Sequence, residues 1–260
     1  MYLYRIIKIL MVTLIYSISY AKENTKQNNY NFVAWYSPPY SFLSEKGKPQ
    51  GLFIEVVSSV CKKLKAHCSF EIIPYRRLLN YAENGKVYGA FPLAMTKERK
   101  EVYIFSIPLA SSKLGLFVKK DNPVVVSESN YNKILNNYIV SSFGPSFTFS
   151  KLEEIKKNTP NMEIFMDIKI ETSFVKFNKN HFETESKEKK SGVFVAKVIG
   201  ENIIKSNKYK NIRYAGDLSQ IIYHIAFFKN RRDLNFVKNF NITLNEMKNN
   251  GELDKIIKKY

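Results

Sequence analysis

Hydrophobic and polar positions alternate over residues 31–36, and Ser37, Pro38 and Pro39 then interrupt the pattern. A period of two predicts a half-buried strand, and the Ser-Pro-Pro run predicts a loop after it. Residues 52–64 instead carry apolar side chains every three or four positions. This period predicts a helix.

Strands and helices continue to alternate after this helix. The next predicted elements are a strand at residues 69–73, a helix at 75–84 closed by Gly85, a strand at 87–93, a polar helical turn at 96–100 and a strand at 114–118. This order is typical of an open α/β sheet, in which ligands usually sit beyond the carboxyl ends of the strands.

The chain changes character at residues 119–123, a charged stretch that contains a proline and that we interpret as a crossing into a second lobe. The elements predicted after it are a strand at residues 138–143, a helix at 150–158, a surface loop at 178–190, a strand at 192–198, a helix at 201–206, an apolar segment at 221–228, a helix at 234–249 and a short helix after Gly251. The predicted fold class is α/β, with residues 30–119 and 215–260 in lobe 1 and residues 120–214 in lobe 2.

The N-terminal segment has the features of a secretory signal peptide. Arg5 and Lys8 form a short basic region, residues 9–18 are apolar, and small residues precede a cleavage point after Ala21. The alternative is a membrane anchor, but this apolar stretch is shorter than the roughly 20 residues that span a bilayer. We expect residues 1–21 to be the signal peptide and the mature protein to be periplasmic.

The chain is strongly basic, with a formal charge of +18 at pH 7. Such an excess of basic over acidic residues is also typical of proteins that bind nucleic acid. Here the lysines are spread along the chain in pairs such as Lys62-Lys63 and Lys258-Lys259, and an exported protein rarely meets nucleic acid. We expect no nucleic-acid partner, and we assign the charge to attraction toward anionic envelope surfaces or anionic solutes.

The two cysteines, Cys61 and Cys68, are close in sequence. In an oxidising compartment, a cysteine at a helix end and another at the start of the next strand can reach disulfide geometry. A metal site that includes His67 is the alternative, although two thiols and one imidazole fall short of the four ligands of a structural zinc. The sequence favours a Cys61–Cys68 disulfide and predicts no metal and no cofactor.

Five motifs carry a family resemblance. They are Tyr-Ser-Pro-Pro-Tyr-Ser-Phe at residues 36–42, Gly-Lys-Pro-Gln-Gly-Leu-Phe-Ile-Glu at 47–55, Thr-Lys-Glu-Arg at 96–99 followed by Phe-Ser-Ile-Pro-Leu at 105–109, Ile-Ala-Phe-Phe-Lys-Asn at 225–230, and Asn-Gly-Glu-Leu at 250–253. In this order and spacing the chain resembles the bacterial extracellular solute-binding proteins of family 3, which include the polar amino acid receptors of ABC importers. The resemblance spans nearly the whole mature chain.

The resemblance implies a type II periplasmic-binding-protein fold, with two lobes that are each a mixed sheet flanked by helices, and two hinge strands between them. It implies a monomer that binds a small polar ligand, anionic or zwitterionic, between the lobes and catalyses nothing. Ligand binding shifts a hinge equilibrium, and an inner-membrane ABC permease is the partner that would recognise the closed form.

In the family, the Arg of a Thr-x-x-Arg motif binds the ligand's carboxylate through two parallel hydrogen bonds, and this motif matches Thr96 and Arg99. The alternative is that Arg99 is an exposed helix charge. Gly144 and Ser146 lie between a predicted strand and a helix, where free amides and the Ser hydroxyl suit an anion. A plain helix cap at Ser146 is the other interpretation.

The residues around this motif differ from those that the family's amino acid receptors carry at the same positions. Phe91, Pro92 and Ala94 stand where hydroxyl-bearing residues are usual in the family, and the acid that holds an α-ammonium is expected near Gly200, where only Glu201 is present. These departures disfavour an ordinary α-amino acid as the ligand.

A less characterised branch of the family carries an aromatic residue and an Arg after a strand-ending Pro, and residues 74–77, Pro-Tyr-Arg-Arg, resemble that pattern. With Trp35, Tyr36 and Tyr40, they would form an aromatic, cationic cleft suited to rings and acids. The alternative is that the aromatic residues belong to the lobe core. The predicted ligand-binding residues are Arg99, Arg77, Tyr75, Trp35, Tyr36, Tyr40, Phe91, Thr96, Gly144 and Ser146.

Two other functions stay open. Some relatives on this fold are cyclohexadienyl dehydratases, which need an acid poised in the cleft, and Glu98 and Glu201 are the candidates for it. The other is a sensor or scaffold module that binds a protein or an envelope surface through its basic charge.

Overall fold

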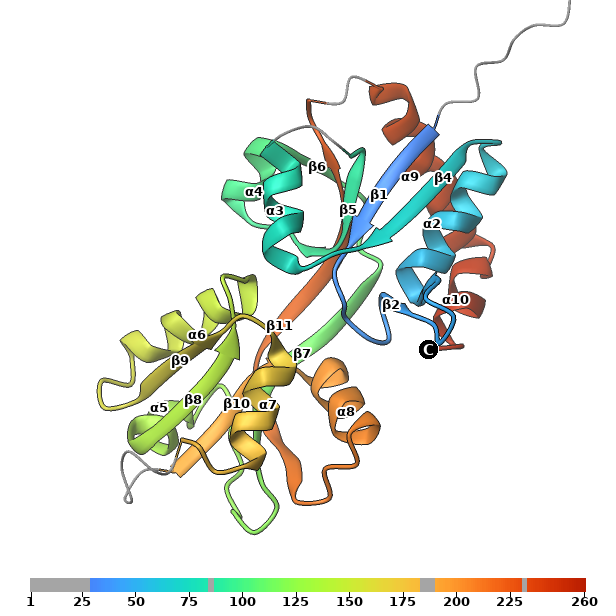
Figure 1. Cartoon of the computed structure of the whole chain (residues 1–260). Coiled ribbons are helices and arrows are strands. Elements are labelled where there is room, and N and C mark those ends of the chain that lie inside the picture. The colour runs from blue at the N-terminus through green and yellow to red at the C-terminus, as the bar shows by residue number, and fades with distance from the viewer. Residues whose placement is uncertain (1–28, 84–86, 183–189, 231–232) are drawn as a thin grey trace, which may run out of the picture.

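The computed structural model describes four stretches of the chain, residues 29–83, 87–182, 190–230 and 233–260. Its elements fall into two lobes joined by two long strands, β7 (Ala110–Lys119) and β11 (Ile212–Phe228) (Figure 1). These strands pair with each other in antiparallel register, from Ile212 opposite Lys119 to Tyr223 opposite Ala110. The predicted signal peptide and Gly85 lie outside the described residues.

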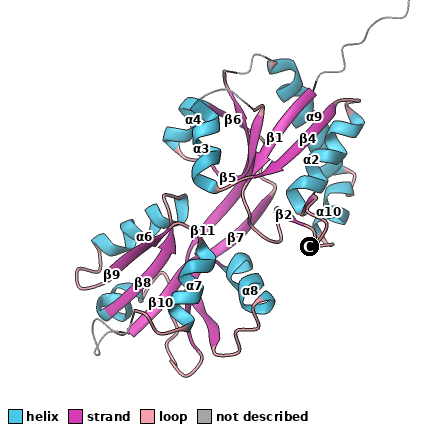
Figure 2. Ribbon diagram, in the orientation of Figure 1, coloured by secondary structure: helices cyan, strands magenta, loops and turns pink. Residues whose placement is uncertain are grey.

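The first lobe has helices on both sides of its strands (Figure 2). Its elements are β1 (Asn29–Ala34), β2 (Phe42–Leu43), β3 (Pro49–Gln50), α2 (Leu52–Lys63), β4 (His67–Ile72), α3 (Tyr75–Glu83), β5 (Gly89–Ala94), α4 (Lys97–Val102), β6 (Tyr103–Phe105), α9 (Leu234–Asn249) and α10 (Glu252–Ile257). Strand β1 is parallel to both β4 and β5, so the carboxyl ends of the three strands share one edge, which faces the second lobe (Figure 1).

The second lobe repeats this plan around strand β8. Its elements are α5 (Tyr131–Ile134), the 3-10 helix η1 (Leu135–Asn137), β8 (Tyr138–Phe143), α6 (Phe147–Lys157), β9 (Glu163–Asp167), α7 (Ile170–Asn178), β10 (Lys190–Ala196) and α8 (Lys197–Ser206). Strand β8 is parallel to both β9 and β10. One sheet therefore runs through the described residues in the order β4-β1-β5-β11-β7-β10-β8-β9, with β6 paired to β11.

The two long strands pair with different neighbours at their two ends. Residues 114–117 of β7 pair with β10 of the second lobe, whereas residues 223–227 of β11 pair with β5 of the first. In the described sheet, residues 111–113 and 220–222 pair only with each other. The lobe boundaries predicted at residues 119 and 214 lie further into the second lobe than these two segments.

Aromatic side chains dominate the core of the first lobe. The rings of Phe32, Phe53 and Phe91 are fully buried and pack on one another, with centroids 6.1 Å apart for Phe32 and Phe91 and 5.8 Å for Phe53 and Phe91. In the second lobe, Phe117 of β7 packs edge-on against Phe174 of α7 at 5.5 Å. Burying one such side chain stabilises the fold by roughly 1.5–3 kcal/mol, so aromatic burial contributes to the stability of both lobes.

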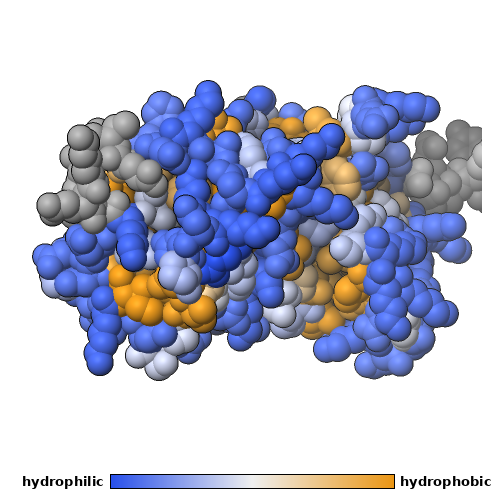
Figure 3. Space-filling model, turned by 90° about the horizontal axis from the view of Figure 1, so that it is seen from below, coloured by the Kyte–Doolittle hydropathy of each residue, from blue (hydrophilic) through white to orange (hydrophobic). Residues whose placement is uncertain are grey.

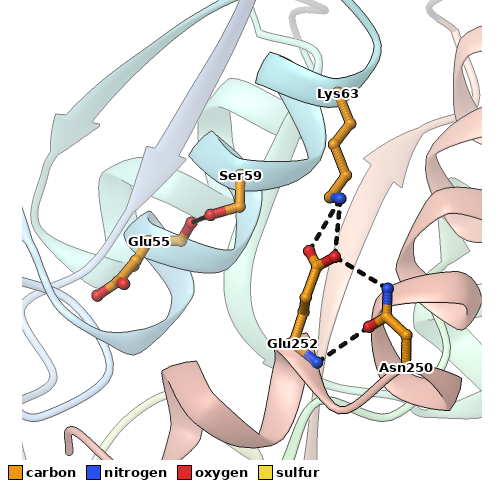
Figure 4. Close-up of polar contacts among 5 residues, drawn as sticks. All are labelled: Glu55, Ser59, Lys63, Asn250 and Glu252. Atoms are coloured by element: carbon orange, nitrogen blue, oxygen red, sulfur yellow. Dashed lines mark hydrogen bonds and ion pairs between the residues drawn. The ribbon is translucent and has the colours of Figure 1, made fainter.

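The C-terminal helix α10 is tied to α2 of the first lobe (Figure 4). Lys63 Nζ forms an ion pair with Glu252 at 2.9 Å, and the same carboxylate accepts a hydrogen bond from Asn250 Nδ2 at 2.9 Å. Along α2, the Ser59 hydroxyl donates to the Glu55 carbonyl at 2.8 Å. The first and the last described segments therefore belong to the same lobe.

The predicted disulfide between Cys61 and Cys68 is present, with an S–S distance of 2.01 Å and a Cα–Cα distance of 6.2 Å. It joins the end of α2 to the amino end of β4, where Cys68 lies opposite Tyr30 of β1. Because the sulfurs are bonded to each other, they are not thiolate ligands for a metal.

Hydrophilic residues cover most of the face shown in Figure 3, and hydrophobic residues gather there in separate patches. Within the described part of the chain, none of the helices has the length and the apolar character that a membrane span requires.

Candidate ligand-binding site

The two lobes meet where the carboxyl ends of parallel strands face each other. Trp35 follows β1 and Arg99 lies on α4, shortly after β5, so both come from one edge of the first lobe. Phe143 is the last residue of β8 in the second lobe. In open α/β sheets this edge is where ligands bind.

Three aromatic side chains, Trp35, Tyr75 and Phe143, pack together across this interface, and we call them the aromatic cluster. The ring centroids are 5.2 Å apart for Trp35 and Phe143, 5.9 Å for Tyr75 and Phe143, and 5.4 Å for Trp35 and Tyr75. The Trp35 indole N–H donates to the Pro92 carbonyl at 2.9 Å, which fixes its ring against β5. Since an aromatic pair contributes about 0.5–1.5 kcal/mol beyond area burial, the cluster stabilises the contact between the two lobes.

Arg99 is half-buried beside the aromatic cluster. The Thr96 hydroxyl caps α4 by accepting a hydrogen bond from the Arg99 amide at 3.2 Å. The guanidinium donates from Nη1 to the Ala94 carbonyl at 2.8 Å and from Nη2 to the Tyr75 hydroxyl at 2.5 Å. Neither of these two acceptors carries a negative charge, although guanidinium pairs most strongly with carboxylates.

A small pocket of about 20 Å³ lies against the Arg99 guanidinium. It is lined by Trp35, Tyr75, Pro92, Leu93, Ala94, Arg99, Phe143, Ser146, Phe147, Thr148, Ile221 and Tyr223. These residues come from both lobes and from β11. A volume of this size holds about one water molecule, so a carboxylate does not fit inside the small pocket in the described arrangement of its lining.

A larger cavity, of about 450 Å³, lies on the other side of the aromatic cluster. It is lined by Trp35, Tyr36, Leu43, Ile72, Ile73, Pro74, Tyr75, Arg76, Phe143, Ile168, Lys169, Ile170 and Glu171. Burial raises the pKa of Tyr36, and the nearby Glu171 carboxylate of the second lobe raises it further. Small-molecule sites typically measure about 300–1,000 Å³ and are mostly apolar, and this cavity agrees with both features.

The structure brings several of the predicted site residues together. Trp35, Tyr75, Arg99 and Ser146 line the small pocket, and Tyr36 lines the larger cavity. Thr96 acts through the helix cap that holds Arg99 in place.

Ser146 and Gly144 lie at the second-lobe side of the interface. The Ser146 hydroxyl accepts from the Phe149 amide at 3.1 Å and donates to the Phe143 carbonyl at 2.8 Å, so it is the N-cap of α6. The Gly144 carbonyl lies 3.5 Å from Arg76 Nη2, a contact that links the two lobes.

Three of the predicted residues point elsewhere. Phe91 has an exposed fraction of 0% and belongs to the core of the first lobe. Tyr40 is also buried and packs against Phe53 and Tyr223, as expected from the alternative of a core position. Arg77 is exposed and donates to the hydroxyl of Tyr81, on its own helix, at 2.5 Å. In these positions none of the three lines either cavity.

Two residues at the interface were not predicted to bind a ligand. Arg76 lines the larger cavity in place of its neighbour Arg77, and Phe143 lines both cavities. A signal for Phe143 is present in the sequence, because it ends a buried strand and directly precedes the Gly-Pro-Ser turn that was predicted to face the ligand.

The proposed catalytic acids lie away from both cavities. Glu98 is exposed, and the Thr96 hydroxyl and a backbone amide lower its pKa. Glu201 of α8 is exposed and lies 3.9 Å from Lys197. Glu171 is the carboxylate that lines the larger cavity.

The two lobes and the two connecting strands define the type II periplasmic-binding-protein fold. The pattern of the bacterial extracellular solute-binding proteins, family 3, matches residues 33–260, and the chain belongs to this family. The resemblance inferred from the sequence is therefore confirmed.

Individual relatives support this assignment. The arginine-binding periplasmic protein of Mannheimia haemolytica is 24% identical over 227 residues, which are 86% of this chain and 86% of that protein. An ancestral arginine-binding protein bound to arginine is 21% identical, with a TM-score of 0.76 over 89% of this chain and 97% of that one. An ancestral amino-acid-binding protein, a precursor of cyclohexadienyl dehydratase, is 18% identical, with a TM-score of 0.72 over 92% and 97% of the two chains. At these identities the solved structures show a shared fold.

Proposed function

We propose that this protein is a periplasmic solute-binding protein that captures a small, carboxylate-bearing ligand between its two lobes. The observation that carries the proposal is the half-buried guanidinium of Arg99 at the lobe interface, whose hydrogen bonds go to the Tyr75 hydroxyl and the Ala94 carbonyl. A guanidinium offers a planar fork of donors that matches a carboxylate. Relatives named for binding arginine support a ligand of this chemistry, because arginine carries a carboxylate.

Residues 111–113 of β7 and 220–222 of β11 are the proposed hinge, because they pair with each other and with neither lobe's other strands in the described sheet. A ligand that touches Arg99 on one side and Phe143 on the other gains its full binding energy only when the lobes are closed. It therefore shifts the hinge equilibrium toward the closed form.

The proposed partner is an inner-membrane ABC permease, which would distinguish the closed form from the open one. The N-terminal pattern supports export, and residues 33–260 match a family of extracellular proteins. We propose that the protein acts as a monomer, because one chain supplies both sides of the site.

A dehydratase on the same fold is less well supported. A general acid must lie within reach of the substrate. Glu98 and Glu201 line neither cavity, and Glu171, the acid that lines the larger cavity, is absent from the lining of the small pocket beside Arg99. Incubation with prephenate or arogenate tests this alternative directly, and product formation would overturn the proposed non-enzymatic role. A scaffold function predicts that no small acid binds.

The proposal is tested by thermal shift against a library of small metabolites. A ligand at 100 times its dissociation constant adds about 2.7 kcal/mol of stability. We expect at least one carboxylate to stabilise the wild type and the Lys100→Ala variant, which changes an exposed lysine on the same helix. We expect it to have little effect on Arg99→Ala and an intermediate effect on Arg99→Lys.

The proposal fails if no acid in the library stabilises the protein, or if the stabilising acids act equally on Arg99→Ala. Trp35 gives a second measurement, because it is the only tryptophan of the chain and packs against Phe143 of the opposite lobe. Its fluorescence is expected to change when the lobes open or close.

A further inference from the structure

The small pocket has an anchor for a carboxylate but not for an ammonium group beside it. Of the twelve residues that line it in the described structure, Arg99 is the one with a charged side chain. An α-amino acid would place its ammonium next to the carboxylate that Arg99 binds. Removing a charged group from water without a partner is strongly unfavourable.

Backbone carbonyls near Arg99 are also engaged. At the end of β5, the Pro92 carbonyl accepts from the Trp35 indole at 2.9 Å, and the Ala94 carbonyl accepts from Arg99 Nη1 at 2.8 Å. Each of these two oxygens already accepts one hydrogen bond, and none of the residues that line the pocket in the described structure carries a carboxylate that could pair with an ammonium. The pocket therefore favours an acid whose carbon next to the carboxylate carries no ammonium.

The aromatic cluster forms a wall that the small pocket shares with the larger cavity. Trp35, Tyr75 and Phe143 line both spaces. Of the thirteen residues around the larger cavity, three are charged, namely Arg76, Lys169 and Glu171, and the other ten are apolar or aromatic. A ligand with its carboxylate at Arg99 would thus place its remaining atoms against aromatic rings and aliphatic side chains.

We infer that the ligand is a carboxylic acid with an aromatic or apolar body and without an ammonium group on the adjacent carbon. This inference rests on the proposed function, since it names the chemical class that the same site accepts. The carboxylate binds Arg99 after displacing the Tyr75 hydroxyl, and the body lies against Phe143 and Trp35. Aromatic packing favours a ring-containing body.

The test compares acids with the amino acids that differ from them by the ammonium group alone. We would titrate the protein with 3-phenylpropanoate and L-phenylalanine, with 4-methylpentanoate and L-leucine, and with L-arginine, following Trp35 fluorescence and thermal stability. Each ammonium-free acid is expected to bind at least about tenfold more tightly than its amino acid, because the unpartnered charge is then absent. Equal or tighter binding of the amino acids, including arginine, would overturn the inference.

Failure of this inference is distinguishable from failure of the proposed function. If leucine, phenylalanine or arginine binds more tightly and Arg99→Ala abolishes that binding, the carboxylate site stands and the ligand class is wrong. If none of the five compounds binds, the inferred ligand class is wrong, and the metabolite library decides whether the carboxylate site stands. If binding is unchanged in Arg99→Ala, both proposals fail.

A second measurement examines the body of the ligand. Phe143→Leu is expected to weaken 3-phenylpropanoate by about threefold to tenfold, the value of one aromatic pair, and to weaken 4-methylpentanoate less. Phe165→Leu is the matched control, because Phe165 belongs to β9 of the same lobe and lines neither cavity. Unchanged affinity of Phe143→Leu for both acids would show that the body does not lie against this ring. The wild-type comparison of the ligand pairs does not depend on the folding of any variant.

Discussion

The hydroxyl of Tyr75 accepts a hydrogen bond from Arg99 Nη2 at 2.5 Å, so a neutral group of the first lobe occupies the donor that a ligand's carboxylate would use. A carboxylate must displace this hydroxyl before it can bind both guanidinium donors. We therefore predict that Tyr75→Phe binds carboxylate ligands about threefold to tenfold more tightly, since one net hydrogen bond of about 1 kcal/mol no longer competes.

Isothermal titration of wild type and Tyr75→Phe with the same acid measures this change. Tyr81→Phe is the control. The Tyr81 hydroxyl also accepts a hydrogen bond from an arginine, Arg77, but both residues are on α3 and line neither cavity. Weaker binding by Tyr75→Phe would show instead that the hydroxyl contacts the ligand.

Alkaline pH is expected to destabilise the protein through Tyr40. Burial raises the pKa of Tyr40 to about 12, although the Ser112 hydroxyl acts in the opposite direction. The unfolded chain releases this proton near pH 10, so between pH 10 and 12 the folded state holds a proton that the unfolded state has lost. The stability from this group is intact below pH 10 and decreases by about 1.4 kcal/mol for each pH unit between pH 10 and the folded-state pKa of about 12.

Urea unfolding at pH 8 and pH 11 checks this pH dependence. Tyr40→Phe removes the titrating group, so its stability should decrease less than that of the wild type between the two pH values, by about 1 kcal/mol. A parallel decrease in both proteins would show that Tyr40 does not titrate in this range.

Gly115 of β7 lies opposite Asp217 of β11, with the β11 backbone close to its Cα. A Cβ at this position would come 2.1 Å from the Gly216 carbonyl oxygen and 2.2 Å from the Tyr214 hydroxyl. Because one of these atoms belongs to the backbone, we predict that Gly115→Ala destabilises the protein by at least about 1–3 kcal/mol. The midpoint of urea unfolding measures the effect. Ser111→Ala, at an exposed position of the same strand, is the control. An unchanged midpoint for Gly115→Ala would show that β7 and β11 have room for a Cβ at this position.

Reduction of the disulfide is expected to lower stability without changing ligand affinity. Cys61 and Cys68 are seven residues apart, so the bond closes a short loop, and the chain-entropy estimate of its contribution is about 2.5 kcal/mol. Cys68 of β4 lies opposite Tyr30, near the amino end of β1, whereas Trp35 follows the carboxyl end of β1.

The measurements are urea unfolding and ligand titration, with and without a phosphine reductant. A Cys61→Ser/Cys68→Ser variant should be insensitive to the reductant. A loss of affinity on reduction would show that the bond controls the site.

The strongly periodic elements were predictable from the sequence. The helix predicted at residues 52–64 is α2 (Leu52–Lys63), and its regular apolar spacing reflects one face packed on the sheet. The segments β9 (Glu163–Asp167) and α7 (Ile170–Asn178) were not predicted. In β9, Phe165 and Met166 are both exposed, because the strand lies at the edge of the sheet, so burial does not follow a period of two.

The length of β11 was also missed, since only residues 221–228 were predicted as an apolar segment. Its pairing with β7 shifts register between Tyr214 and Gly216 and again between Asp217 and Ser219. Each shift moves the side chains to the opposite face, so the strand shows no continuous alternation from which its extent could be recognised.

At the site, the sequence identified the type of group but not always the residue. Neighbouring residues on a helix point about 100° apart, and this rotation places Arg76 at the larger cavity while Arg77 turns toward Tyr81. Phe91 was included for its place just before Thr96, but it faces the interior, where it packs on Phe32 and Phe53. Which aromatic residue meets the opposite lobe depends on tertiary packing, which no local pattern contains.

The return of α10 to α2 has a consequence for the order in which the lobes can be assembled. The second lobe is one uninterrupted run of chain inside the first, so its core is complete as soon as the early part of β11 has emerged from the ribosome or the export channel. The first lobe must wait for α9 and α10, which follow β11 in the chain. The first lobe, whose strands are synthesised first, is therefore completed last. The edge of β5 that pairs with β11 stays uncovered until the rest of β11 has been made.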